Sequence, residues 1–291
     1  MKRLRELRIG GGYTQEQLAE MLKVSQQTIA RWETGKAKPN IAALRDIAVI
    51  FGTSVDHLIE FSKTGRKPST VHYSVLGNDE GFWGHLGLLL LDAPNTRWFP
   101  ISLSQANSIA QYSTHSNSKW LVVSTLNNRV LIINLSEVKR LWVLDDAADQ
   151  PGDDWVLNWD AYEGYAGEIY KGIEDLIVNE EELVSEDNYS ATLQEIISKI
   201  AVDKGLDMDK AREFVCYTHI HFTDGSSISY EVEPEDLGAV VFTAELEEKF
   251  DSLIQMSRVE MQADSYFSPT TIRLIDIPRH KLQDKDNEIS E

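Results

Sequence analysis

Residues 14–33 read TQEQLAEMLKVSQQTIARWE, and this stretch predicts two short helices joined by a tight turn. Thr14 is a helix-capping residue, and Gln17 three positions later completes the pattern of a capping box. The apolar residues that follow recur at helical spacing and predict one buried face: Leu18, Ala19 and Leu22. We therefore predict a first helix that begins after Thr14 and ends before a turn at residues 23–24.

The second helix of the pair begins after Ser25, which is also a capping residue. Ile29 and Trp32 are predicted to face the core, and Gly35 suits the left-handed residue that follows a helix. The outer side carries four polar residues: Gln26, Gln27, Thr28 and Arg31. Because Gln can form two hydrogen bonds with adenine and Arg two with guanine, this side suits base reading in the DNA major groove.

A longer stretch, residues 4–61, resembles the Cro/C1-type (XRE family) helix-turn-helix domain that lambdoid phage repressors share with many bacterial regulators. The matching segments are LRELR, YTQEQLAEMLKVS, QQTIARWETGKAKP, NIAALRDIAVIFGTS and VDHLI, about a fifth of the chain. The resemblance implies an all-α, lambda-repressor-like domain of five short helices, at roughly 2–9, 15–22, 26–33, 41–51 and 55–61.

The resemblance also implies roles for single residues. It places Gln15 where the family anchors a DNA phosphate. The base-reading positions are filled by Gln26, Gln27 and Arg31, with Thr28 on the same side. The positions that hold the DNA backbone are filled by Lys36, Lys38 and Asn40. One departure is the run of three glycines at 10–12. Each helical glycine costs about 1 kcal/mol relative to Ala, so we expect the first helix to be short or frayed at its end.

Charge separates this module from the rest of the chain, whose formal net charge is −19. Residues 1–67 contain twelve Lys and Arg against seven Asp and Glu, a net of +5, which leaves −24 for residues 68–291. A basic module can bind phosphates, whereas a strongly acidic body is repelled by them. We therefore do not expect the acidic body to contact DNA.

A polar stretch containing Gly and Pro, residues 62–70, predicts the linker between the two parts. The helix-turn-helix domain is then 1–61. The acidic body is 71–278, either as one unit or as two at about 71–180 and 190–262. The chain is predicted to be multidomain, with the all-α domain followed by an α+β body of antiparallel hairpins.

Beyond the linker the hydrophobic period becomes that of strands, with turn signals at Asn127-Asn128 and Asp224-Gly225. We predict strands at 88–91 with 98–103, 120–125 with 130–135, 138–144, 214–222 with 227–232, and 240–242. Three segments that follow strands resemble one another, at 102–109, 134–141 and 231–237. They indicate either an internal duplication of a small β unit or the common course of a strand followed by a turn.

Helices are expected to interrupt this β pattern. Residues 162–178 are predicted to be partly helical, and 191–201 form a helix capped by Ser190. Residues 244–261 carry the strongest apolar stripe, which suits core packing better than a dimer face. The charged end, 279–291, is expected to be frayed or disordered.

The acidic body offers little chemistry. His219 and His221 alternate on one strand face with Cys216 on the other, so a metal site would need a bulge, and a solvated histidine pair is the preferred interpretation. The acidic run at 145–154 lacks the spacing of a calcium loop. Aromatic residues at 155–170 suit a core better than a ligand pocket. We predict no enzyme, no metal and no cofactor.

Composition bounds the compartment. The single cysteine, Cys216, excludes an internal disulfide framework. The longest apolar run, residues 86–91, is far too short to span a membrane. The first residues lead directly into a helix without the pattern of a signal peptide. We therefore expect a cytoplasmic protein.

Two functions of different class follow. The first is a sequence-specific transcriptional regulator, expected to be a repressor, that reads operator DNA with helix 26–33 as a homodimer. Its acidic body would dimerise or sense a signal, either a small molecule or a protein partner. The second is an antitoxin-like or other protein-interaction protein, whose acidic body binds a partner and whose helix-turn-helix serves only autoregulation.

Overall fold

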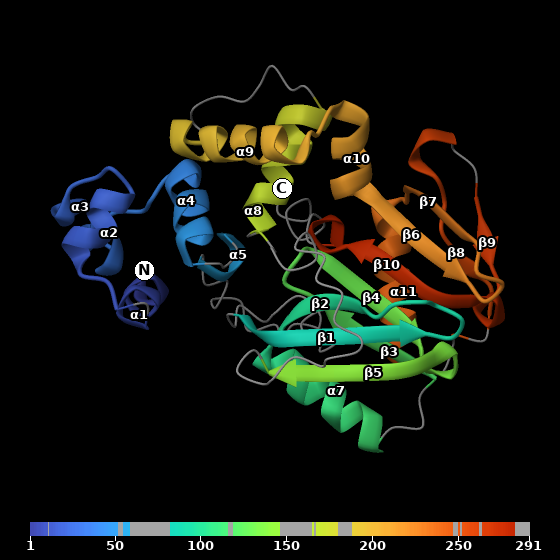
Figure 1. The fold of residues 1–291 in the computed structure, drawn as a ribbon. Helices are drawn as coiled ribbons and strands as arrows, with labels where there is room; N and C mark the ends of the chain where they lie inside the picture. Colours follow the sequence, from blue (N-terminus) through green and yellow to red (C-terminus); the bar gives the residue numbers. More distant parts are fainter. Residues whose placement is uncertain are drawn as a thin grey trace. The chain divides into compact units, whose positions relative to one another are not determined.

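The computed structural model describes residues 1–10, 12–51, 55–58, 82–115, 119–145, 165, 167–179, 188–246, 250, 252–261 and 264–282. The chain divides into two compact units (Figure 1). One is Met1–Arg66 with Tyr165–Arg212, and the other is Lys67–Gly164 with Glu213–Glu291. The linker predicted at 62–70, most of the acidic run at 145–154 and most of the aromatic stretch at 155–170 lie outside the described residues.

The described residues of the first unit begin with the helices coloured blue in Figure 1: α1 (Lys2–Gly10), α2 (Gln15–Met21), α3 (Gln26–Glu33), α4 (Ile41–Phe51) and the short α5 (Val55–Leu58). Each contributes to one shared core, to which belong Leu4, Leu18, Ile29, Ile47 and Leu58. The predicted helices at 26–33 and 41–51 are confirmed. The first helix, expected at roughly 2–9, runs from Lys2 to Gly10, and the chain turns at Gly12, whose φ is 73°.

A later helical segment belongs to the same unit. Helix α8 (Gly167–Ile173) continues into the π-helical turn η3 (Glu174–Val178), and α9 (Ala191–Lys204) follows. Ser190 Oγ accepts a hydrogen bond from Leu193 N at 3.1 Å, which confirms the predicted cap. Gly205, with φ of 62°, ends α9. The predictions of a helix at 191–201 and of partial helix within 162–178 are confirmed.

In the second unit, the described residues include ten strands. They are β1 (Phe82–Leu90), β2 (Arg97–Ser102), β3 (Trp120–Ser124), β4 (Arg129–Asn134), β5 (Val138–Asp145), β6 (Tyr217–Phe222), β7 (Ser227–Glu231), β8 (Ile254–Gln255), β9 (Tyr266–Phe267) and β10 (Ile272–Pro278). A three-stranded sheet has the order β2–β1–β5, and a five-stranded sheet the order β3–β4–β10–β6–β7. All pairings are antiparallel.

The five-stranded sheet has a different covering on each face. Helix α11 (Pro234–Leu246) supplies Leu237, Val240 and Ala244 to the core on one face. On the other face, strands β1 and β2 and helix α7 (Leu103–His115) pack against β3, β4 and β10. This second core includes Leu88, Ile101, Ile109, Leu131 and Leu274.

The three predicted hairpins are present as β1–β2, β3–β4 and β6–β7. The way these hairpins are arranged in the sheets was not predicted. Strand β5 pairs with β1 in the three-stranded sheet, and β10 lies between β4 and β6 in the five-stranded sheet. The three similar segments also take different structures. Residues 102–109 enter α7, 134–141 form the 3-10 turn η1 (Leu135–Glu137) and part of β5, and 231–237 enter α11. The internal duplication therefore stays a prediction.

Three secondary-structure predictions were wrong. The helix expected at 244–261 ends at Leu246, and residues 240–242 are helical instead of extended, because α11 begins at Pro234. Proline suits the first position of a helix, and this signal outweighs the β propensity of the valines. The apolar residues after α11 do not form one helical face, because Leu253 is 64% exposed and Ile254 pairs with Phe267 in a strand.

The strand expected at 214–222 also begins later. Helix α10 (Met208–Cys216) occupies its first residues and crosses from one unit into the other, so that β6 begins at Tyr217. Asp207 Oδ1 accepts from Lys210 N at 2.9 Å and caps α10. Cys216 is therefore a buried residue at the end of a helix, not a strand residue opposite the histidines.

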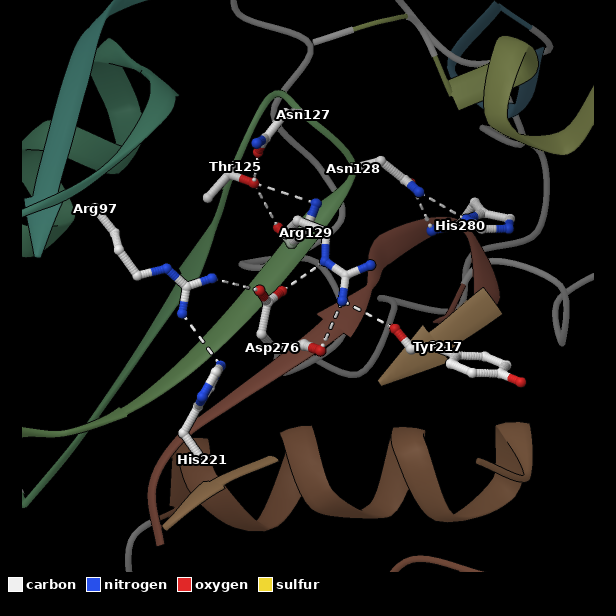
Figure 2. Close-up of polar contacts among 9 residues, drawn as sticks. All are labelled: Arg97, Thr125, Asn127, Asn128, Arg129, Tyr217, His221, Asp276 and His280. Carbon is white, nitrogen blue, oxygen red and sulfur yellow. Dashed lines mark hydrogen bonds and ion pairs between the residues drawn. The ribbon is translucent and has the colours of Figure 1, made fainter. Parts of the chain in front are cut away.

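The end of the chain is ordered further than expected. Residues 279–282 form the 3-10 turn η6 (Arg279–Leu282), and His280 and Leu282 are buried. Asn128, in the β3–β4 turn with φ of 64°, binds His280 twice (Figure 2). Asn128 Nδ2 lies 2.8 Å from His280 Nδ1, and His280 N donates to Asn128 Oδ1 at 3.0 Å. Within the described residues, none of the helices has both the length and the apolar character needed to cross a membrane.

Candidate nucleic-acid interface

Helix α3 presents a polar face to solvent. Gln26, Gln27 and Arg31 are exposed, and Ile29 and Trp32 on the opposite side are buried, as predicted. Within the part of the chain that the structure describes, these three polar side chains have no hydrogen-bond or ion-pair partner. Thr28 is half-buried, and its Oγ1 lies 2.9 Å from Ser25 Oγ. The side chains with free donors and acceptors are therefore the two glutamines and the arginine.

Both ends of α3 are fixed. At its start, Ser25 Oγ accepts from Thr28 N at 3.2 Å, and the turn before it places Lys23 in the left-handed region with φ of 52°. At its end, Gly35 has φ of 74°. The Gly35 and Lys36 amides donate to the carbonyls of Trp32 and Arg31, at 3.1 and 2.8 Å, which is the Schellman motif. The predicted caps are confirmed, and the exposed face is held on a rigid helix.

A buried carboxylate joins α3 to the two helices before it. Arg8 Nε donates to Glu33 Oε1 at 2.5 Å, and Gln15 Nε2 donates to Glu33 Oε2 at 2.7 Å. Burial raises the pKa of Glu33, but the hydrogen bonds and charge of Arg8, together with Gln15, outweigh it and lower the pKa below its ordinary value. Sequence reasoning missed this cluster, because residue spacing gives no sign of which helices bring opposite charges together.

The residues expected to hold the DNA backbone differ in whether their side chains already have a hydrogen-bond partner within the protein. Gln15 is engaged with Glu33, and Asn40 Oδ1 caps α4 by accepting from Ala43 N at 2.9 Å. Lys36 and Lys38 are exposed, and in the described parts of the chain neither side chain has a partner. Gln15 and Asn40 thus position helices, and the two lysines remain available to an anion.

The later helical segment packs against α4 of the helix-turn-helix. Arg45 Nε lies 3.3 Å from Glu168 Oε2, and its guanidinium lies 4.1 Å from the centre of the Tyr189 ring. Asp46 Oδ1 accepts from Ser190 Oγ at 2.7 Å. The sequence predicts separate domains for these residues, whereas these contacts join α4 to residues 167–179 and 188–204, which belong to the same unit.

Comparison with known proteins agrees with this geometry. A helix-turn-helix family model matches residues 4–58. The HTH-type transcriptional activator BcrR of Enterococcus faecalis is 45% identical over 58 residues, which are 20% of this chain and 28% of that protein. The SPbeta prophage-derived uncharacterized HTH-type transcriptional regulator YonR of Bacillus subtilis (strain 168) is 34% identical over 59 residues, 20% of this chain and 55% of that protein.

Residues 4–58 are therefore a helix-turn-helix domain of the Cro/C1 type, as the resemblance predicts. The similarity is confined to this part, and the chain spans well under two thirds of each relative. No solved structure matches the chain.

Proposed function

We propose that this protein is a sequence-specific DNA-binding transcriptional regulator that inserts α3 into the major groove. The observation that carries the proposal is the exposed row of Gln26, Gln27 and Arg31 on a helix capped at both ends. A rigid helix presenting free amide and guanidinium groups can form the paired hydrogen bonds that distinguish bases.

Electrostatics support the same surface. Lys36 and Lys38 follow α3 directly and are exposed, so they can contact phosphates beside the groove that α3 enters. The net charge of +5 over residues 1–67, against −24 for the remainder, confines the attraction for DNA to this part of the chain. Affinity for DNA should consequently fall steeply as salt rises.

A single α3 reads only a short half-site. We propose that the protein binds as a homodimer to two half-sites about 34 Å apart, and that the acidic body dimerises or senses a signal. We expect repression of its own promoter. The relatives' names include an activator, and the place of the operator relative to the promoter decides the sign.

The test is binding of the full-length protein to the DNA upstream of its own gene, beside a random duplex of equal length, over a series of salt concentrations. A footprint with two symmetric halves on the upstream DNA supports the proposal. Equal, weak binding to both duplexes contradicts it. In that case co-purification of a stoichiometric basic protein would favour a partner-binding role for the acidic body.

A further inference from the structure

One face of the five-stranded sheet changes character at β10. On β3, β4 and β10, this face carries apolar residues that pack under the three-stranded sheet and α7, among them Leu131, Ile133 and Leu274. Residues paired across antiparallel strands share a face. Asp276 of β10 pairs with Leu131 on one side and with His219 on the other, and Leu274 pairs with His221.

Beyond β10 the same face is polar. His219 pairs with Ser229 of β7, and His221 pairs with Ser227. The two histidines are half-buried and the two serines are exposed. We call Arg97, His219, His221 and Asp276 the polar cluster. It lies where the apolar covering of the sheet stops, with Arg97 on the edge strand β2.

Arg97 of β2 contacts one residue of β6, His221, and one residue of β10, Asp276, as Figure 2 shows. Its Nη1 lies 3.1 Å from His221 Nε2, and its Nη2 lies 3.6 Å from Asp276 Oδ2. Because a guanidinium can only donate, His221 must accept through Nε2 and carry its proton on Nδ1. Burial, together with the charge of Arg97, lowers the pKa of His221 to about 4, so the imidazole is neutral near pH 7.

The negative charge of Asp276 is already balanced. Arg129 Nε donates to Asp276 Oδ1 at 2.5 Å, and Arg129 Nη2 donates to the carbonyls of Tyr217 and Asp276, at 3.0 and 2.8 Å (Figure 2). Burial raises the pKa of Asp276, but the charges of Arg129 and Arg97 outweigh it and keep the carboxylate ionised. Two guanidinium groups thus face one carboxylate and two neutral imidazoles.

The surplus positive charge rests on Arg97, whose side chain is 43% exposed and whose guanidinium has more N–H groups than these two contacts use. We propose that the polar cluster binds a small anion carrying a carboxylate or phosphate group. Arg97 supplies the ion pair, and His221 and His219 supply hydrogen bonds from their N–H groups. A metal cation does not fit, because two guanidinium groups repel it and Arg97 already engages the Nε2 lone pair of His221.

The experiment is calorimetric titration of the full-length protein with inorganic phosphate and, separately, with succinate, at pH about 7 and constant ionic strength. We expect binding of at least one anion. Arg97→Gln should weaken it by about tenfold or more, because it removes the charge-assisted hydrogen bonds. The matched control is Lys139→Gln, which removes one exposed positive charge from β5 of the same unit and should leave binding unchanged.

Equal weakening by the two substitutions, or no binding of either anion to the unaltered protein, overturns the proposal. If Arg97→Gln does not fold, His219→Phe replaces it, because this change removes an N–H donor and keeps a ring at a half-buried position. Weaker binding by that variant supports the site, and unchanged binding contradicts it. Phosphate without succinate binding indicates a phosphorylated ligand, and the reverse indicates a carboxylic acid.

The binding of the anion does not depend on the proposed function. Its role as the signal that the regulator senses rests on that function. Upstream DNA is therefore titrated with and without a saturating amount of the bound anion, at constant ionic strength. Anion binding without specific DNA binding contradicts the proposed function and leaves the site intact. Specific DNA binding by a protein that binds neither anion contradicts only the site.

Discussion

Arg45 of α4 and Glu168 of α8 form a largely buried ion pair, with Nε 3.3 Å from Oε2 and side-chain exposures of 17% and 9%. The pair joins the helix-turn-helix to a segment more than a hundred residues later in the chain. Arg45 also donates from Nη1 to the Asn188 carbonyl at 3.1 Å and lies over the Tyr189 ring. One side chain thus connects α4 to α8 and to the residues just before α9.

Arg45→Met should lower the free energy of unfolding of this unit by about 2–4 kcal/mol, because it removes the ion pair with Glu168, the hydrogen bond to the Asn188 carbonyl and the contact with the Tyr189 ring. The measurement is urea denaturation followed by circular dichroism. Arg3→Met is the control, because Arg3 pairs with Glu6 on the surface at 3.6 Å and its loss should cost less than about 1 kcal/mol. Equal losses from the two variants would show that the contact with α8 contributes nothing.

The helix-turn-helix could be predicted because its signals are local. Thr14, Ser25 and Gly35 cap or end helices within a few residues of the positions they act on, and the spacing of Ile29 and Trp32 fixes the buried side of α3. Gln15 is engaged because Glu33 lies near it in space, whereas Lys36 has no such partner within the described residues. Such pairs follow from tertiary packing, which one sequence does not show.

The body was predicted less well for the same reason. Strand β10 is the centre of the five-stranded sheet, yet its sequence lies beyond a stretch whose stripe suggested a helix. The hairpins have local turn signals, such as Asn128 and Gly225 with positive φ, and these were found. Which hairpins share a sheet depends on contacts far apart in sequence. The polar cluster was missed because Arg97, His221 and Asp276 come from three distant strands.

Substitutions in α3 should separate base reading from phosphate binding. Gln26→Ala or Arg31→Ala should weaken binding to the specific site by about 1–3 kcal/mol and relax base preference at the contacted position. Lys36→Ala should weaken specific and random DNA alike and reduce the salt dependence by about one ion. Competition binding against single-base variants of the site measures both effects. Equal losses on every duplex from all three changes would contradict these roles.

Glu33→Gln should destabilise the helix-turn-helix in a pH-dependent way. The folded state holds the pKa of Glu33 below its ordinary value of 4.5, so its charge stabilises the fold above that pH and the contribution is lost as pH falls through the lowered pKa. At pH near 7 the variant should lose about 1–3 kcal/mol, and the difference should shrink in acid. Glu16→Gln, at an exposed position on α2, is the control and should change little. A difference that persists in acid would rule out the charge as its cause.

Two helical glycines differ in their surroundings. A Cβ at Gly172 of α8 would lie 2.2 Å from Ile197 Cδ1 and 3.3 Å from Tyr189 Cε1, whereas a Cβ at Gly238 of α11 meets no atom within 4 Å. Gly238→Ala should stabilise its helix by about 0.5–1 kcal/mol. Gly172→Ala gains the same helix propensity but crowds the buried side chain of Ile197 in α9, so we expect a net loss of about 1–3 kcal/mol. Thermal unfolding of both variants checks the sign, and stabilisation by both would show that α8 and α9 are not closely packed.

His221 should make the second unit sensitive to acid. Its pKa is 6.5 in the unfolded chain and about 4 in the fold, so the unfolded state takes up a proton first and the free energy of unfolding decreases as pH falls between those values. Full burial would make this loss about 3 kcal/mol, and partial exposure reduces it to about 1–2 kcal/mol.

Urea denaturation between pH about 7 and about 4.5 should therefore show a flatter profile for His221→Gln than for the unaltered protein. Comparing the two profiles cancels the contributions of the many carboxylates that both share. Thr28→Gln, in the other unit, is the control and should leave the slope unchanged. Parallel profiles for all three proteins would mean that His221 is as accessible to protons in the fold as in the unfolded chain, and would contradict the neutral imidazole beside Arg97.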